Sequence, residues 1–180
     1  MKKLSHEDIL KIKPSKEDVL KKKRSPIIVV LDNIRSLYNV GSIFRTSDAI
    51  LAEKIYLCGI TGTPPRNEIS KTALGAQDVV PWEYEKDVVK TIKKLKRKKI
   101  KIFAVELAHK AKKYDKIVTD FPVALILGHE VNGVKDEVME LVDGCVFVPM
   151  LGRANSLNVA TCFGIVAYEF LKKFNNKRKK

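Results

Sequence analysis

The sequence has few cysteines and no long apolar run. Its three cysteines, Cys58, Cys145 and Cys162, lie far apart and form no CxxC or other metal-ligand spacing, which argues against a metal centre and against a disulfide framework. They are typical of buried thiols in a reducing cytoplasm. No apolar run reaches the length of a bilayer-spanning helix, and the charged N-terminus does not resemble a signal peptide. We therefore expect a cytoplasmic protein with no metal and no membrane anchor.

Acidic residues are scarce relative to basic ones. Thirty-five Lys and Arg face twenty-one Asp and Glu, which gives a net charge of +14. Such an excess attracts polyanions, because each neutralised phosphate releases counterions. The alternatives are RNA, DNA, an acidic membrane surface, or a basic surface kept only for solubility. The size of the imbalance favours a nucleic acid but does not choose RNA over DNA.

Length and hydrophobic content indicate one compact domain, since the chain has 180 residues and 45% of them are hydrophobic. Short β-branched runs alternate with segments of helical periodicity, which predicts an α/β fold with a mainly parallel sheet and helices on both faces. We expect strands at residues 27–31, 54–58, 79–82, 101–105, 122–128 and 145–148. We expect helices at residues 40–51, 72–76, 86–99, 135–142 and 157–174. No internal repeat is visible.

Basic segments flank the expected domain. Residues 1–24 form a charged extension, in which Ser15 and Asp18 match the pattern of a helix capping box. The end of this extension is either a solvated charge run or a clamp for phosphates, and the two interpretations are weighted equally. The charged cluster consists of Lys21, Lys22, Lys23 and Arg24. The domain is expected at residues 25–174, with a basic tail at residues 175–180.

Two polar loops follow strongly apolar strands, and ligands of parallel α/β proteins bind at such positions. Glu130 comes just after the strand at 122–128 and is expected to face the ligand crevice. The stretch 147–160 combines a strand end, a polar loop and a helix start, which is typical of a ligand loop. Either Asn155 or Ser156 is expected to cap that helix. Along the helix runs a line of small side chains, namely Ala160, Gly164 and Ala167.

Several candidates also have an ordinary structural interpretation. Arg45 stands off the apolar stripe of the helix at 40–51, and from this segment alone a salt bridge to Asp48 explains it better than catalysis. Trp82 is expected to pack against the core rather than to stack on a base. His109 is expected to be exposed to solvent.

Three motifs taken together are more specific than any one of them. They are Asn39-Val40-Gly41 followed by Arg45, the segment 127–134, and Val148-Pro149-Met150 followed by the segment 156–160. In this order and at these separations they resemble the motifs of the SpoU/TrmH family of RNA 2'-O-ribose methyltransferases, in the SPOUT superfamily. The resemblance covers about residues 27–172, nearly the whole chain after the extension.

The resemblance implies a deep trefoil knot in the C-terminal part of the domain, an exception to the rule that chains are unknotted. The knot loops would hold S-adenosyl-L-methionine, and the family works as a homodimer with the site near the interface. The resemblance assigns catalytic roles to Asn39, Arg45, Glu130, Ser156 and Asn158. It assigns cofactor binding to Leu127, Gly128, Val148, Met150, Ser156 and Leu157. RNA contacts are expected from the cluster Lys21, Lys22, Lys23 and Arg24. Arg153 is either a further phosphate contact or a solvated charge of its loop, and the two interpretations are weighted equally.

Methyl transfer to a ribose 2'-hydroxyl requires that the oxygen lose its proton while the donor carbon is held in line. A guanidinium has a pKa above about 12 and is a poor base, so Arg45 is expected to bind a substrate phosphate and to stabilise the developing alkoxide. By the resemblance, Asn39 would orient Arg45. Asn158 and Ser156 would fix the ribose and the edge of the cofactor. The proton would leave through a neighbouring phosphate, Glu130 or water.

The substrate favoured by the resemblance is the guanosine of the tRNA D-loop, with the tRNA wobble nucleotide and a ribosomal RNA ribose as alternatives. A catalytically silent RNA-binding protein of the same fold is the competing class, and the five matched catalytic residues argue against it. A nucleotide-cofactor oxidoreductase is disfavoured, because no strand is followed by GxGxxG. One departure is His129, where the family commonly has a small or amide residue, although an imidazole can hydrogen-bond there.

Overall fold

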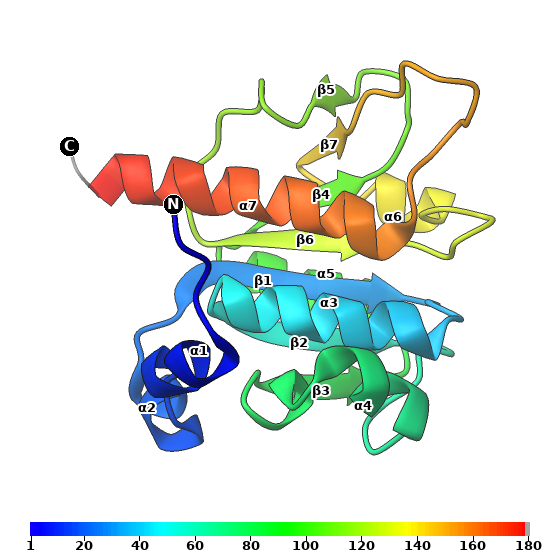
Figure 1. Cartoon of the computed structure of the whole chain (residues 1–180). Helices are drawn as coiled ribbons and strands as arrows, with labels where there is room; N and C mark the ends of the chain where they lie inside the picture. The colour runs from blue at the N-terminus through cyan, green and yellow to red at the C-terminus, as the bar shows by residue number, and fades with distance from the viewer. Residues whose placement is uncertain (179–180) are drawn as a thin grey trace.

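A seven-stranded sheet forms the centre of the protein, in a computed structural model that describes residues 1–178 (Figure 1). Every strand pairing is parallel, and the strand order is β3-β2-β1-β6-β4-β7-β5. The strands are β1 (Ser25–Asp32), β2 (Ala52–Cys58), β3 (Trp82–Glu85), β4 (Lys101–Val105), β5 (Lys112–Lys113), β6 (Val123–Leu127) and β7 (Gly144–Phe147). The helices are α1 (His6–Ile12), α2 (Lys16–Lys21), α3 (Leu37–Ala49), α4 (Asn67–Ala73), η1 (Ala76–Asp78), α5 (Val88–Arg97), α6 (Asp136–Met139) and α7 (Val159–Arg178).

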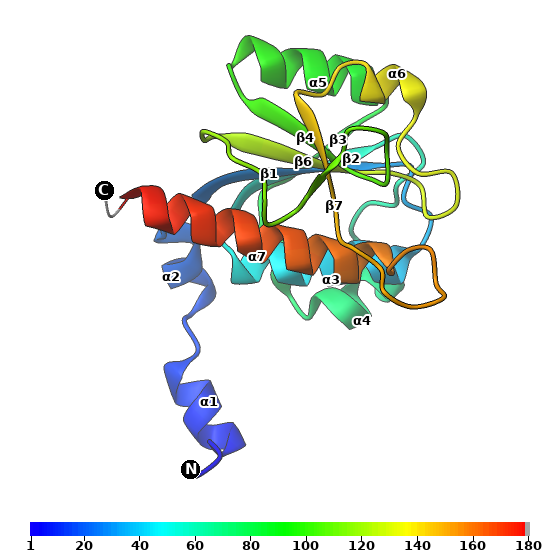
Figure 2. The ribbon, with the colours of Figure 1, turned by 90° about the horizontal axis from the view of Figure 1, so that it is seen from above.

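Helices cover both faces of the sheet, which explains why its central strands have no polar alternation. All five residues of β6 are buried, and so are seven of the eight residues of β1. One apolar cluster lies under α3, α4 and α7, and a second lies under α5 and α6. Figure 2 shows these two helical layers on opposite sides of the sheet. The predicted α/β class, the parallel sheet and the two helical faces are confirmed.

The structure corrects several predicted boundaries near the two edges of the sheet. The strand expected at 79–82 begins only at Trp82, because Val79 ends η1 as its C-cap and Val80 is buried in the core. Trp82 packs against the core, as expected. Helix α4 begins five residues before its predicted start and ends at Ala73, and its C-cap Leu74 is in the left-handed region. Strand β5 was not predicted, and it has only two residues, both exposed.

The cysteines are free, and burial makes their thiols weak acids. Cys58 is buried, while Cys145 and Cys162 are half-buried. Burial raises the pKa of Cys58 to about 12 and the pKa values of Cys145 and Cys162 to about 11. None of the three is therefore a ready nucleophile. Among residues 1–178, no helix is long and apolar enough to cross a membrane.

The N-terminal extension consists of two short capped helices. Ser15 and Asp18 form the predicted capping box at α2, and Ser5 and Asp8 form an equivalent box at α1. The segments 5–11 and 15–21 share the pattern Ser-x-Glu-Asp-Ile/Val-Leu-Lys, ten residues apart. The extension therefore contains a short internal repeat, and the expectation of no repeat is wrong. Neither helix has a buried residue, and the extension projects from the domain in Figure 2.

The ends of the chain join the domain differently from the prediction. The guanidinium of Arg24 donates hydrogen bonds to the carbonyl oxygens of Ala52 and Val79, so this arginine fastens the extension to the sheet. Helix α7 continues through the start of the expected basic tail and includes Lys177 and Arg178. The last two residues of that tail, Lys179 and Lys180, lie outside the described residues.

Gly41 allows α3 to approach α4 closely. A Cβ atom at this position would lie 2.1 Å from the Thr72 hydroxyl oxygen and 2.3 Å from the Ile69 carbonyl oxygen. Because one of these atoms belongs to the backbone, α4 itself would have to move. The glycine in the first motif therefore serves helix packing and not a ligand.

Replacing Gly41 with alanine should lower the free energy of unfolding by about 1–3 kcal/mol, because the added methyl group overpacks the α3–α4 contact. Gly152→Ala is the matched control, since nothing lies within 4 Å of a Cβ at Gly152. The control should be neutral or stabilising by up to about 1 kcal/mol. Urea unfolding followed by circular dichroism measures both changes. Equal effects of the two substitutions would contradict the packing role.

Candidate active site

A cavity of about 400 Å³ opens at the carboxyl ends of β4, β6 and β7. In a parallel sheet this edge is where ligands bind. The loop after β6 forms one wall, and the segment between β7 and α7 forms another. The residues around it include Val105, Glu106, Leu127, Gly128, Glu130, Val148, Ser156, Leu157, Asn158 and Cys162.

The loop after β6 folds tightly on itself. A Cβ atom on Gly128 would lie 2.3 Å from the carbonyl carbon and oxygen of Gly133, so only glycine permits this approach. The His129 carbonyl accepts a hydrogen bond from the Gly133 N–H at 2.8 Å. The Nδ1 atom of His129 accepts from the N–H groups of Val131 and Asn132, at 3.0 and 3.2 Å. The imidazole therefore does hydrogen-bond, and its role is to close the loop.

Glu130 joins this loop to the start of α3. One carboxylate oxygen accepts from the Arg35 N–H at 3.0 Å, and the other accepts from the Ser36 N–H at 3.0 Å. The second oxygen also accepts from the side-chain amide of Asn39 at 3.1 Å. These donors belong to a segment more than 90 residues earlier in the chain.

Two asparagine amides extend the network to α7, and their orientations are forced. Asn39 uses its NH₂ group on Glu130, so only its oxygen is left to accept the hydrogen bond from the Asn158 amide at 3.0 Å. The oxygen of Asn158 then accepts from the N–H groups of Ala160 and Thr161, at 3.0 and 3.3 Å. Asn158 is thus the residue that caps α7, and the prediction of Asn155 or Ser156 is wrong, because the helix begins only at Val159.

The network keeps Glu130 ionised. Burial favours the neutral acid, but the hydrogen bonds from Arg35, Ser36 and Asn39 outweigh it and lower the pKa of Glu130 below its ordinary value. A carboxylate with a lowered pKa and three donors accepts a further proton poorly. Its chemistry is that of a fixed negative charge which holds three segments together.

Glu106 is a site residue that the sequence interpretation missed. It follows the end of β4 and lines the cavity, as Glu130 does after β6. Its carboxylate accepts from the Leu107 N–H at 2.8 Å and from the Val134 N–H at 3.0 Å. The argument that singled out Glu130, an acid just beyond the carboxyl end of a buried strand, applies equally to Glu106 and would have found it.

The structure brings most of the predicted cofactor residues together. Five of the six line the cavity, namely Leu127, Gly128, Val148, Ser156 and Leu157. Met150 is not among the residues around the cavity. Of the catalytic candidates, Glu130, Ser156 and Asn158 line the cavity, and Asn39 contacts two of these three. Among residues 1–178, no group of His, Cys, Asp or Glu is arranged to hold a metal ion.

Arg45 lies apart from these residues. It is exposed on α3, and within residues 1–178 it has neither the expected salt bridge to Asp48 nor a contact with Asn39. Six residues of helix separate Arg45 from Asn39, which places them about 120° apart around the axis and about 9 Å along it. Within residues 1–178, Asn39 forms no hydrogen bond with Arg45 and instead joins Glu130 to Asn158, so its orienting role on Arg45 stays a prediction.

The basic residues expected to contact RNA differ in their exposure to solvent. Lys21, Lys22, Lys23 and Arg153 are exposed. Arg24 is not, because its guanidinium is held by two backbone carbonyls, so it is removed from the expected phosphate clamp. His109 is exposed, as expected.

Known proteins are similar to this chain in sequence. A tRNA (guanosine(18)-2'-O)-methyltransferase of Thermus thermophilus is 28% identical over 153 residues, which cover 85% of this chain and 78% of that enzyme. A protein of the same name from Aquifex aeolicus is 30% identical, over 84% of this chain and 72% of the relative. A 23S rRNA (guanosine-2'-O-)-methyltransferase of Vibrio vulnificus is 29% identical, over 92% of this chain and 70% of the relative.

Solved structures of similar proteins have a similar fold. The crystal structure of the A. aeolicus TrmH/SpoU tRNA modifying enzyme superimposes with a TM-score of 0.80 and 29% identity, over 88% of this chain and 80% of that one. The AdoMet-bound rRNA methyltransferase of Sinorhizobium meliloti gives a TM-score of 0.75 and 28% identity, over 84% of this chain and 58% of that one. The sequence profile described as the SpoU rRNA Methylase family matches residues 26–168. The chain therefore belongs to the SpoU rRNA methylase family.

Proposed function

We propose that this protein transfers a methyl group from S-adenosyl-L-methionine to a ribose 2'-hydroxyl of RNA. The observation that carries the proposal is the hydrogen-bond network from Glu130 through Asn39 to Asn158, which fixes polar groups of three distant segments at the rim of one cavity. Relatives named as tRNA and rRNA 2'-O-methyltransferases support the same chemistry. A silent RNA-binding protein would have no need for so rigid a rim.

The cavity suits the cofactor in size and lining. Its volume of about 400 Å³ falls within the range of about 300–1,000 Å³ that is usual for small-molecule sites. Leu127, Val148 and Leu157 provide apolar surface, and the close approach at Gly128 leaves loop backbone facing the cavity. Bound there, S-adenosyl-L-methionine supplies an activated methyl group. Ser156 and Asn158 would position the ribose and the edge of the cofactor.

The protein's remaining task is to handle the proton and the developing charge of the 2'-oxygen. Glu130 is a poor proton acceptor, because its pKa is lowered and its oxygens are occupied. The proton therefore leaves to a neighbouring phosphate or to water. Arg45, whose guanidinium has no partner within residues 1–178, binds a substrate phosphate and stabilises the alkoxide.

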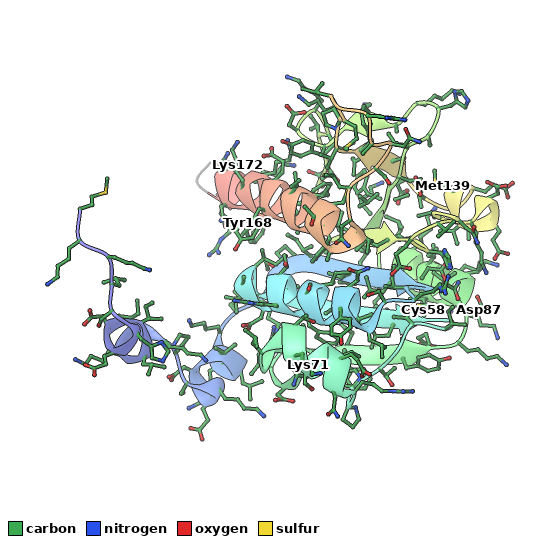
Figure 3. The ribbon with its side chains drawn as sticks, turned by 45° about the vertical axis from the view of Figure 1, so that its right-hand side comes forward. Cys58, Lys71, Asp87, Met139, Tyr168 and Lys172 are labelled. Atoms are coloured by element: carbon green, nitrogen blue, oxygen red, sulfur yellow. The ribbon has the colours of Figure 1, made fainter. Side chains whose placement is uncertain are left out.

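A homodimer would bring Arg45 close to a site, because the second copy would pack beside the helix that carries it. The exposed side of α7 carries Tyr168 and Lys172 (Figure 3), and a Cβ at Gly164 would have open space around it. A second copy packed there would lie beside α3 and its Arg45, since α3 and α7 are in contact. Of the small residues expected to allow such packing, Ala167 is fully buried in its own core and is excluded.

We also propose the trefoil knot for residues 123–158. Two features support it: the loop after β6 and the segment before α7 line the same cavity, and β7 pairs beside β4 and not beside β6. The domain would comprise residues 25–174, flanked by the basic segments 1–24 and 175–180. Lys21, Lys22, Lys23 and Arg153 would contact RNA phosphates, and the half-buried and buried free cysteines suit a cytoplasmic protein.

The favoured substrate is a tRNA guanosine in the D-loop. This choice follows the two relatives named for guanosine 18 of tRNA, which this chain covers over 78% and 72% of their lengths. Ribosomal RNA is the alternative, supported by the relative of V. vulnificus, and the tRNA wobble nucleotide is a third substrate of the same class.

Incubating the protein with labelled S-adenosyl-L-methionine and either bulk tRNA or ribosomal RNA should label one RNA and block alkaline cleavage at one ribose. Arg45→Ala should lower kcat by about 10²–10³, because an alkoxide donor is lost, and should leave cofactor affinity unchanged. Arg97→Ala, an exposed arginine on α5, is the control and should keep activity. RNA binding without transfer by the unaltered protein would favour the silent binder, and a loss of cofactor affinity in Arg45→Ala would contradict the assigned role.

Glu130→Gln should destabilise the protein by about 1 kcal/mol at pH 7, because three hydrogen bonds to a charged oxygen become weaker. The native pKa of Glu130 lies below the ordinary 4.5, so its stabilisation is complete above that value and is lost as pH falls through the native pKa. The difference between the two proteins in urea unfolding should therefore shrink below about pH 4.5. Glu53→Gln, at an exposed carboxylate without a hydrogen bond in the described chain, should show little difference at any pH. A difference that grows on acidification would refute the ionised bridge.

Gly164→Ala tests the dimer face. If a second copy packs on α7, the added methyl group should weaken dimerisation about tenfold. Without a partner, the same change should stabilise the helix by up to about 1 kcal/mol. Sedimentation velocity over a concentration series measures the association, with Gly152→Ala as control. Unchanged association together with raised stability would exclude this face from the interface.

A further inference from the structure

A second cavity lies at the opposite end of β4 from the active site. Lys101 begins β4 and lines this cavity, whereas Val105 ends the strand and lines the proposed cofactor cavity. Phe103 also lines the second cavity, so along β4 the two linings come within two residues of each other, about 7 Å at about 3.3 Å per residue. The second cavity has a volume of about 640 Å³ and shares no lining residue with the first.

The floor of this cavity is apolar. Ile117 and Val118 come from the segment between β5 and β6, and Met139 (labelled in Figure 3) and Val142 come from α6 and the turn after it. Val118 is 86% exposed, so its apolar side chain is open to solvent beside the more buried Ile117. The floor therefore offers apolar surface that a flat ring could cover.

The rim carries positive charge that the protein does not neutralise. Lys101, Lys110 and Lys112 line the cavity, and within residues 1–178 none of them forms a salt bridge. The two carboxylates of the lining are already paired with lysines that do not line it. Asp120 pairs with Lys177 of α7, and Asp143 lies 3.9 Å from Lys96 of α5. Lys177 and, more weakly, Lys101 lower the pKa of the Asp120 carboxyl, so the charge of Lys101 is partly offset. Lys110 and Lys112 form no salt bridge within residues 1–178, and they carry the rest of the charge that faces the cavity.

We propose that this cavity binds a nucleotide of the RNA substrate other than the one that is methylated. The apolar floor would pack against the base, and the ammonium groups would contact its phosphates. This inference rests on the proposed function, because it takes RNA as the substrate. The cavity would add a contact that fixes the orientation of the RNA on the sheet edge without taking part in the chemistry. A free nucleotide has the same chemistry, and competition distinguishes it from RNA.

The test compares two triple variants, each of which removes three positive charges. The cavity variant is Lys101→Ala, Lys110→Ala and Lys112→Ala. The control variant is Lys71→Ala, Lys86→Ala and Lys93→Ala, at exposed lysines elsewhere on the domain (Lys71 is labelled in Figure 3). Binding of labelled, unmodified tRNA is measured from 50 to 200 mM salt, with methyl transfer measured on the same preparations. The cavity variant should bind about tenfold more weakly, with a log–log salt slope shallower by about 1–2, and the control should change less than threefold.

Photocrosslinking adds a readout that depends on contact and not on net charge. RNA carrying 4-thiouridine should crosslink to peptides that contain Val118 or Met139 in the unaltered protein, and millimolar AMP should not abolish the crosslink. Equal losses of affinity in the two triple variants, or crosslinks confined to the first cavity and the extension, would overturn the proposal. Displacement by AMP at low concentration would show a free-nucleotide site and would also overturn it. Failure of the unaltered protein to methylate any RNA would instead remove the proposed function.

Discussion

The active site depends on one carboxylate that holds separate parts of the chain. Glu130 accepts hydrogen bonds from the start of α3, and through Asn39 it sets the orientation of Asn158, which caps α7. Each partner has one way to satisfy its donors and acceptors, so the chain of bonds has a single arrangement. A protein with a net charge of +14 thus organises its site around an anion whose carboxylate is held by three donors of its own chain. The positive charges that would attract RNA lie outside that centre.

Charge and packing are separated in space. The extension, the loop with Arg153 and the rim of the second cavity carry exposed cations, whereas the helix contacts near the first cavity are set by glycine and by apolar side chains. Gly41 is an example. It belongs to the motif that also contains Asn39 and Arg45, but its neighbours are the Thr72 hydroxyl and the backbone of α4, so it serves packing. Most of the exposed cations are in this way separate from the packed residues of the site, and Arg45 is the residue to which both tasks are assigned.

The sequence predicted the parts of the fold that depend on local pattern. The runs 27–31 in β1, 102–105 in β4 and 123–127 in β6 are apolar, which only strands buried on both faces require, and their positions are confirmed. The short edge strand β5 and the true start of β3 were missed, because neither has a distinctive pattern. In the site, Glu130 could be predicted from its place after a strand, and Glu106 could have been. The partner of Asn158 could not be derived from spacing, since 119 residues separate it from Asn39.

The central position of β6 has a consequence for synthesis. β1 ends at residue 32, and its neighbour β6 begins only at residue 123, so about 90 residues must leave the ribosome before β1 gains its second partner. At 5–20 residues per second this takes roughly 5–20 seconds. During that interval β1 to β3 can pair, but β1 presents an unpaired, wholly apolar edge, which is the kind of surface that aggregates. The nascent chain should therefore be most in need of a chaperone after its first half has emerged and before β6 arrives.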